Sequence, residues 1–374
     1  MTAQPWRQLR RGCIPSADAM GILLPFDYRN QIGNVSSSMN GHSRLHWVSV
    51  LGVKVGCAAL LLWIIYANID FASVRQRVDR VSAFTCLLLT FVFALHAVLS
   101  AVRWQTIVVH LGGSASFRAV VSGSLVERFV NQALPAIVGG DGARIVELVR
   151  SGEKVVIAAH SVFIDRLFSL AGAFGLVLVL LPLSSLTTTP IRFRLILMLV
   201  SAASLLAVAA LLIPRPSFWA RLDGNRLARF VSRVATVFQE FLLTPRLAVL
   251  KIGVSLIMQA LFVGCFLILS YDLKIDLPIT EAAALVPLVM LASLIPVSLA
   301  GWGVREAAAA ALLPTAGVPI SDAVTLSLLF GIAYLVTSCL AGVIWLIMHA
   351  VGRRDADAGP DEAGGTARSD SQST

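Results

Sequence analysis

A short pattern of proline, glycine and arginine occurs twice in this chain, each time inside apolar sequence. It reads PAIVGGDGAR at residues 135–144 and PVSLAGWGVR at residues 296–305. Proline and glycine interrupt helices, and an arginine is costly where a helix should lie in a bilayer. We therefore interpret Pro135 and Pro296 as helix breaks within a membrane. Breaks at corresponding positions of two halves are typical of the binding sites of transporters.

The composition supports a membrane protein. The chain has 374 residues, of which 57% are hydrophobic and only 14% charged, whereas a soluble domain has about 25% charged residues. The net charge of +9 is typical of basic cytoplasmic loops, so we do not read it as nucleic-acid binding. The five scattered cysteines form no metal-ligand or disulfide pattern. We expect no metal and no cofactor.

Apolar stretches divide the chain into candidate spans, since a helix crosses a bilayer core in about 20 residues. The clear spans are residues 46–66, 82–103, 155–183, 191–213, 247–270 and 320–349. Two shorter apolar stretches, 118–134 and 281–297, run into the proline breaks. They are followed by short helical stretches at 143–151 and 304–313.

We interpret each short pair as a re-entrant helical hairpin. The predicted fold is therefore an all-α polytopic membrane protein with six full spans and two opposed hairpins. The order span, span, hairpin, span occurs in a first membrane repeat, residues 46–183, and again in a second, residues 191–349. Three crossings per half is an odd number, so the halves have opposite orientations and form an inverted repeat.

Loop charges are the test of this topology. Residues 214–246 contain six arginines and two acidic residues, which predicts a cytoplasmic loop. Loops 183–190 and 271–281 have no basic excess and are expected outside. Loop 67–81, also expected outside, has three arginines against two aspartates and so disagrees. Eight full crossings, which make the repeats parallel, remain the alternative.

Both ends of the chain are polar. Residues 1–45 are predicted to be a disordered basic arm, and residues 352–374 a disordered tail rich in Gly, Asp, Ser and Thr. We expect both termini to be cytoplasmic. Met39 is a candidate alternative start, which leaves open whether residues 1–38 belong to the protein.

The first hairpin contains the candidate anion site. Glycines before a helix start expose backbone N–H groups, and an arginine adds donors suited to phosphate. The alternative is packing, with glycines allowing close helix approach and Arg144 neutralised by Glu147 one turn away. The candidate residues are Asn131, Gly139, Gly140, Asp141, Gly142, Arg144 and Glu147.

Further candidates lie in the next span and in the second hairpin. Arg166 follows Asp165 and is expected to pair with Glu147, with a substrate phosphate, or to extend to the membrane surface. The second hairpin contributes Gly301, Gly303, Arg305 and Glu306. We predict that Arg144 and Arg305 face one polar cavity, lined by Asp141, Glu147, Asp165 and Glu306. His96 and His160 are expected to be core residues.

Three motifs carry a resemblance to a known family. They are Asn131 to Arg144, Ser161 to Leu167, and Ile295 to Glu306. Together they resemble the signatures of the lysylphosphatidylglycerol synthase transmembrane-region family, also called the flippase-like domain. The similarity extends over residues 46–350. An arginine that the family pattern places in the last span is missing here, where residues 328–333 read LLFGIA.

The resemblance implies an inner-membrane protein with six to eight spans. In the best-known members this region moves aminoacylated phosphatidylglycerol across the bilayer, and a separate soluble domain makes that lipid. This sequence stops soon after residue 350, so we expect no synthase domain and no lysyl transfer. Other members are associated with polyprenyl-linked sugar and polysaccharide assembly.

Three functional hypotheses follow. The first is a flippase-like transporter for an anionic phospholipid or a polyprenyl-phosphate-linked lipid. The second is a membrane-embedded enzyme with Asp141, Glu147 or Asp165 as acid or base. The third is an accessory subunit of lipid-linked sugar or polysaccharide assembly, docked on a glycosyltransferase. Membrane lipids are the expected partners in each case.

Overall fold

The computed structural model describes residues 81–133, 137–184, 191–210, 226–295, 298 and 300–357. In these ranges every regular element is helical. The arm 1–45, the span 46–66, both prolines of the repeated pattern and residues 358–374 lie outside the described part. The long helices are α5 (Ala83–His110), α8 (Val155–Leu180), α9 (Ile191–Ala210), α12 (Pro245–Asp272) and α15 (Ile320–Asp357). The shorter ones are α6 (Phe117–Ala133), α7 (Ile137–Arg150), α11 (Arg226–Leu243), α13 (Ile279–Ala292), α14 (Val304–Leu312) and η3 (Leu313–Ala316).

Four described helices are long and apolar enough to cross a membrane. They are residues 83–110, 155–180, 248–272 and 320–351, and each coincides with a span expected from the sequence. Helix α9 matches the expected span 191–213 in position, but its apolar part, 194–206, is shorter. The chain is therefore a multi-pass helical membrane protein. Helix α15 continues to Asp357, beyond the expected start of the tail.

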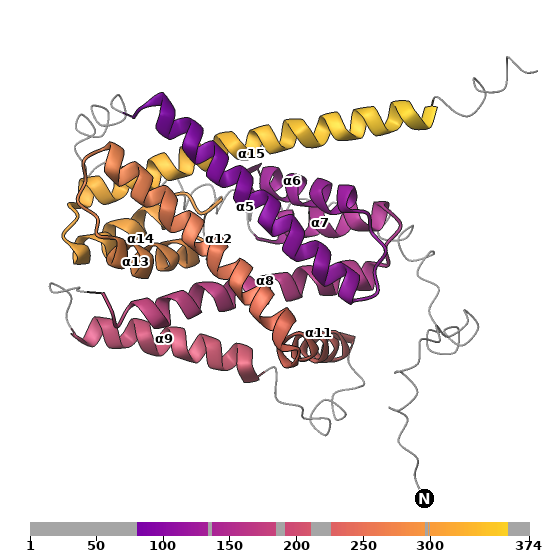
Figure 1. Ribbon diagram of the computed structural model, residues 1–374, viewed down its shortest axis with the longest axis horizontal. Helices are drawn as coiled ribbons and strands as arrows, with labels where there is room; N and C mark the ends of the chain where they lie inside the picture. The colour runs from indigo at the N-terminus through magenta and orange to yellow at the C-terminus, as the bar shows by residue number, and fades with distance from the viewer. Residues whose placement is uncertain are drawn as a thin grey trace, which may run out of the picture. The chain divides into compact units, whose positions relative to one another are not determined.

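Helices α5 and α12 lie side by side and run in opposite directions (Figure 1). Ser82 caps the start of α5 by accepting a hydrogen bond from Thr85 N–H, and its own N–H donates to Asp272, the last residue of α12. Near the other end, Arg103 Nη1 donates to Ser255 Oγ at 2.7 Å. The two helices are therefore antiparallel.

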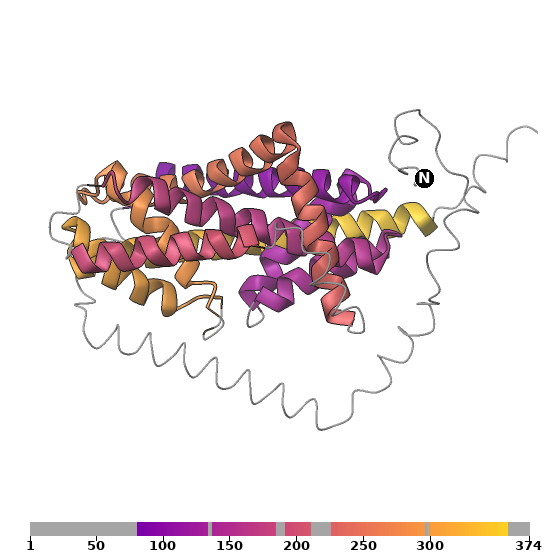
Figure 2. The ribbon, with the colours of Figure 1, turned by 90° about the horizontal axis from the view of Figure 1, so that it is seen from below.

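Each of these two helices leads into a helical hairpin. Helices α6 and α7 follow α5, and α13 and α14 follow α12. Because α5 and α12 are antiparallel, the hairpins begin at opposite ends of the bundle, as Figures 1 and 2 show. Ser114 Oγ donates to Glu153 Oε1 at 3.1 Å, which joins the residues before α6 to those after α7. The first hairpin thus returns to the end from which it started.

The helix contacts are reciprocal between the two halves. Helix α8, at the end of the first half, packs on α13 of the second, and α15, at the end of the second, packs on α6 of the first. Likewise α5 contacts α15, and α12 contacts α8. Each hairpin therefore packs against one span of the opposite half as well as against spans of its own half.

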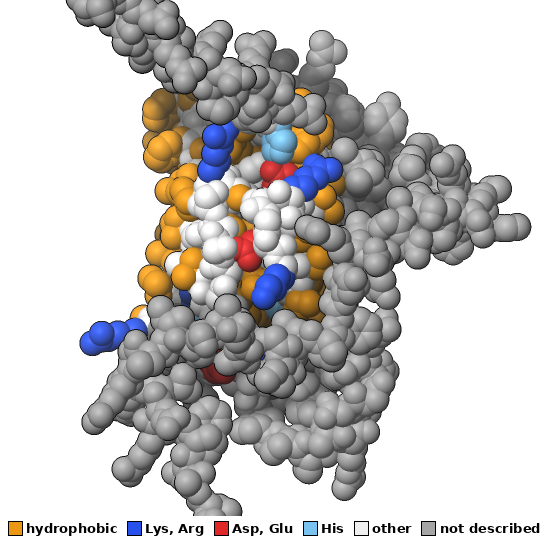
Figure 3. Space-filling model, turned by 90° about the vertical axis from the view of Figure 1, so that its right-hand side faces the viewer, with side chains coloured by type: hydrophobic (Ala, Val, Ile, Leu, Met, Phe, Trp, Pro, Cys, Tyr) orange, Lys and Arg blue, Asp and Glu red, His pale blue; other side chains and the backbone are white. Residues whose placement is uncertain are grey.

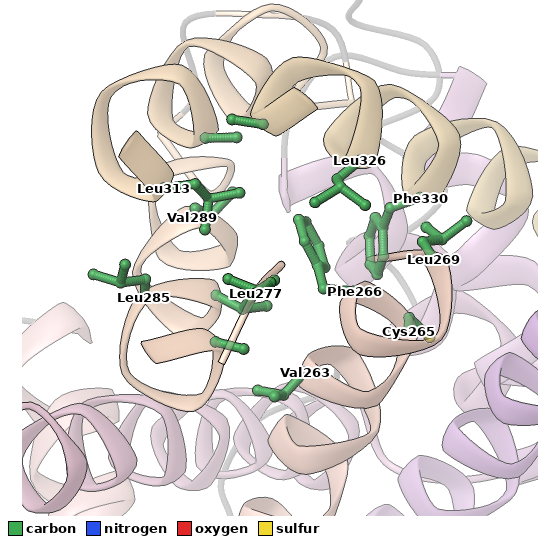
Figure 4. Close-up of a cluster of buried hydrophobic side chains, with 14 of the residues drawn as sticks. Val263, Cys265, Phe266, Leu269, Leu277, Leu285, Val289, Leu313, Leu326 and Phe330 are labelled. Carbon is green, nitrogen blue, oxygen red and sulfur yellow. The ribbon is translucent and has the colours of Figure 1, made fainter. Parts of the chain in front are cut away.

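The largest buried cluster lies around the second hairpin (Figure 4). Phe266 of α12 and Phe330 of α15 have ring centroids 5.2 Å apart, and they pack with Leu285, Val289 and Leu313. Lipid chains are as apolar as these side chains, so close packing rather than water exclusion stabilises this region. Apolar side chains on the outer faces of the long helices, such as Phe84 and Leu87 of α5, are exposed, as expected for contact with lipid.

Candidate functional site

A cavity of about 750 Å³ lies between the two hairpins. Its wall combines an apolar part, to which Phe262, Met290 and Leu294 contribute, with a charged part. The charged residues lining it are Arg103 of α5, Glu127 and Arg128 of α6, Asp141 and Arg144 of α7, Asp165 and Arg166 of α8, and Arg305 of α14. An amphipathic cavity of this kind accommodates a polar group and an apolar chain together.

Arg144 is at the centre of the charged wall. Its side chain is 1% exposed, and its Nη1 lies 3.2 Å from Glu127 Oε2 and 3.1 Å from Asp165 Oδ2. The guanidinium carbon is 3.9 Å from the centroid of the Trp104 ring, a favourable cation–π arrangement. The second oxygen of Asp165 accepts from Arg103 Nε at 2.8 Å. Four helices thus share one buried ion network.

Arg166 is the more accessible member of this network. Its side chain is 32% exposed, and its Nη2 lies 2.6 Å from both Glu127 Oε1 and Asp141 Oδ1. The sequence-based pairing of Arg166 with Glu147 is therefore wrong. Glu147 lies elsewhere and accepts from Ser122 Oγ at 2.6 Å, with His349 Nε2 at 3.1 Å. It thus pairs with neither Arg144 nor Arg166, although Arg144 is one turn away on the same helix.

In the second hairpin, the charge of Arg305 is neutralised by a carboxylate of the same hairpin. Arg305 Nη2 lies 2.7 Å from Glu306 Oε1, and the guanidinium is within 5.0 Å of the Trp302 ring centroid. Glu306 Oε2 accepts from Gly303 N–H at 2.6 Å, so it occupies the helix start where an anion would bind. Gly301 and Gly303 have φ of +79° and +82°, a turn that favours glycine.

The glycines of the first hairpin behave differently. Helix α7 begins at Ile137, so Gly139, Gly140 and Gly142 are helical and no glycine loop precedes the helix. A Cβ on Gly140 would lie 2.2 Å from Asn131 Oδ1. These contacts match the packing alternative, in which glycine lets α6 and α7 approach closely. Only Gly139 and Gly140 of the three lie in the first turn, where N–H groups are not used by the helix.

Both arginines of the repeated pattern line the same cavity, together with Asn131, Asp141, Asp165 and Gly301. Glu147 and Glu306 are not among its lining residues. His96 is buried as expected, but it also lines the cavity and contacts Arg128. The span expected from the sequence ended at Arg103, although α5 continues to His110 and the arginine is 2% exposed. The apolar residues after Arg103, Ile107 to Val109, were the signal that could have corrected this.

The comparison with known families agrees with this architecture. The sequence pattern described as "Lysylphosphatidylglycerol synthase TM region" matches residues 49–342. The chain belongs to this family. The match includes both hairpins, the spans α5, α8 and α12, and most of α15. No curated protein matches the chain.

In this member of the lysylphosphatidylglycerol synthase transmembrane-region family, Gly331 of α15 lies against the side chain of Arg305. A Cβ at this position would lie 2.0 Å from Arg305 Nη2 and 3.1 Å from the Trp302 ring. Gly331 lies in the stretch where the family pattern suggested an arginine. In this chain the stretch instead provides the space that the Arg305 guanidinium occupies.

Proposed function

We propose that this chain is a flippase-like transporter that moves an anionic phospholipid or a polyprenyl-phosphate-linked lipid between leaflets. The cavity between the hairpins carries the proposal, because one wall is charged and another is apolar. A headgroup can leave the aqueous surface only if a polar path replaces its hydration within the bilayer. The buried arginine network supplies such a path, and the apolar wall fits the lipid chains.

We further propose that the two halves form an inverted repeat. The antiparallel contact of α5 and α12, which hold corresponding positions in the halves, supports this arrangement. In a parallel repeat, corresponding helices run in the same direction. The reciprocal packing of α8 on α13 and of α15 on α6 supports the same relation. An inverted repeat favours two opposed re-entrant hairpins over eight full crossings.

The orientation that we propose places the start of the first hairpin at the cytoplasmic side of an inner membrane. Arg118, Arg150 and Lys154 lie at this end of the bundle, together with the arginines of α11. Basic residues are retained on the cytoplasmic side. Figure 3 views this end, where charged side chains of both signs lie between hydrophobic flanks.

The enzyme hypothesis receives less support from the site. Glu127, Asp141 and Asp165 each lie within 3.2 Å of an arginine nitrogen. A carboxylate held ionised by arginine is a poor general acid, and no carboxylate pair in the described cavity wall is free of such partners. We therefore favour transport over covalent chemistry.

Reconstitution in vesicles tests the proposal. Phosphatidylglycerol and a polyprenyl phosphate, each labelled near the headgroup, are mixed into vesicles with the purified protein, and a membrane-impermeant quencher reports the accessible fraction. We expect quenching of the outer half only in empty vesicles and of nearly all label in protein-containing vesicles. Equal quenching in both samples for every anionic lipid would reject transport. Mass analysis of the recovered lipids identifies any covalent change, which favours the enzyme.

A further inference from the structure

The cavity wall contains one arginine that the ion network leaves uncompensated. Arg103, Arg144 and Arg166 share Glu127, Asp141 and Asp165, and Arg305 pairs with Glu306. Among the described residues, Arg128 has no carboxylate oxygen within 4.0 Å. Both oxygens of its chain neighbour Glu127 already contact Arg144 and Arg166.

Within the described part of the chain, the side chain of Arg128 makes a hydrogen bond to a histidine. Arg128 Nη2 lies 2.7 Å from His96 Nδ1, and because a guanidinium only donates, His96 Nδ1 must accept. His96 is therefore the neutral tautomer with its proton on Nε2, and its ring stacks on Phe262 at 4.4 Å between centroids. A neutral histidine orients Arg128 but cannot neutralise it.

Arg128 is also buried, at 8% exposed, and lines the cavity. A buried charge without a partner is strongly destabilising unless another ion compensates for it. Arg144 is 1% exposed, and its Nε and Nη2 have no hydrogen-bond partner among the described residues. These two Arg144 nitrogens are themselves buried, so the cavity presents the Arg128 guanidinium and an excess of positive charge to whatever enters it.

We propose that Arg128, oriented by His96, is the anchor for a phosphate-bearing headgroup in this cavity. This inference rests on the proposed transport function and narrows its substrate class. The favoured substrates carry net negative charge, as a phosphatidylglycerol or a polyprenyl phosphate does. An aminoacylated phosphatidylglycerol with a cationic side chain brings further positive charge to this site and is disfavoured.

Binding to the purified full-length chain is the direct test. The probes are phosphatidylglycerol, a polyprenyl monophosphate, lysylphosphatidylglycerol, diacylglycerol and inorganic phosphate alone, each measured as a dissociation constant in detergent. We expect the two anionic lipids to bind at least ~10-fold more tightly than diacylglycerol, as a charge-assisted hydrogen bond provides. Lysylphosphatidylglycerol should bind more weakly than phosphatidylglycerol. If inorganic phosphate alone binds more weakly than the anionic lipids, the apolar wall also contributes to the affinity. The ligand is then a lipid and not free phosphate.

The variants Arg128→Gln and Arg128→Lys separate charge from geometry. Arg128→Gln should weaken the binding of the anionic lipids by ~10-fold or more and leave the affinity for diacylglycerol unchanged. Arg128→Lys should retain part of the affinity for the anionic lipids because it retains the charge. Arg150→Gln, at the exposed end of α7, is the matched control and should bind as the parent does. Size-exclusion profiles and thermal unfolding check that each variant is folded.

Two results would overturn the inference. One is unchanged anionic-lipid affinity in folded Arg128→Gln, and the other is equal or tighter binding of lysylphosphatidylglycerol in the parent. The vesicle assay keeps this failure distinct from failure of transport. Flipping that is insensitive to Arg128→Gln rejects the anchor but keeps the transporter. Binding that depends on Arg128 without any flipping keeps the anchor and rejects transport.

Discussion

At the scale of single residues, the buried charges are placed by partners on other helices. Arg144 interacts with a carboxylate on α6, a carboxylate on α8 and an indole ring on α5. Each ion is desolvated, and the mutual attraction offsets that cost only while all partners are present. The network therefore connects four helices at one position and makes the charged wall of the cavity rigid.

Removing Arg144 should be more damaging than its single position suggests. Arg144→Ala leaves Glu127 and Asp165 with one arginine partner each and exposes one face of Trp104. We therefore expect the free energy of unfolding to fall by about 3–5 kcal/mol. Thermal unfolding of the purified protein measures it, with Arg150→Ala as the exposed control on the same helix. A melting temperature equal to that of the control would show that the network does not stabilise the fold.

At the scale of elements, close helix crossings depend on glycine at particular positions. A Cβ on Gly172 of α8 would lie 2.7 Å from Ser255 Cβ and 3.2 Å from the Ser255 carbonyl carbon. Ser255 also accepts from Arg103, so this crossing positions part of the ion network. Gly175, one turn later on α8, has open space where its Cβ would be.

These two glycines provide a matched pair of variants. Gly172→Ala should destabilise the protein by about 1–3 kcal/mol, because α8 and α12 must separate. Gly175→Ala should be neutral or stabilise by up to about 1 kcal/mol, because alanine is the better helix former. Thermal unfolding of the two variants side by side measures the difference. Equal effects would mean that the α8–α12 crossing tolerates a methyl group.

At the scale of the whole molecule, each hairpin packs against one span of the opposite half. A movement of one half relative to the other therefore changes both walls of the cavity at once. In an inverted repeat, such a movement opens the cavity toward one side and closes it toward the other. This coupling is what a transporter of a lipid headgroup requires.

Topology is testable by cysteine labelling in cells. Gly112, after α5, and Lys274, after α12, hold corresponding places in the two halves. In a background with the native cysteines replaced by serine, a membrane-impermeant maleimide should label Lys274→Cys from outside. Gly112→Cys should react only after the membrane is permeabilised. Labelling of both positions from the same side would contradict the inverted repeat and favour parallel halves.

The sequence alone determined the membrane class, the family and the positions of the four described helices that are long and apolar enough to cross a membrane. Apolar length and helix-breaking residues are local properties, so they can be read along the chain. Arg144 and Arg305 line one cavity, as predicted, but Glu147 and Glu306, which were expected in its wall, do not. The glycines at 139–142 were less predictable, since glycine is compatible both with a loop and with close helix packing.

Only the tertiary structure decided which charges meet. On one helix, a sequence reveals neighbours three or four positions apart, which suggested that Arg144 pairs with Glu147. The observed partners, Glu127 and Asp165, come from other helices, and Glu147 instead contacts α6 and α15. Ion pairing in a buried site depends on distances across helix crossings, which no local pattern encodes. The uncompensated charge of Arg128 depends on the same crossings, because they bring the carboxylates to the other arginines of the cavity.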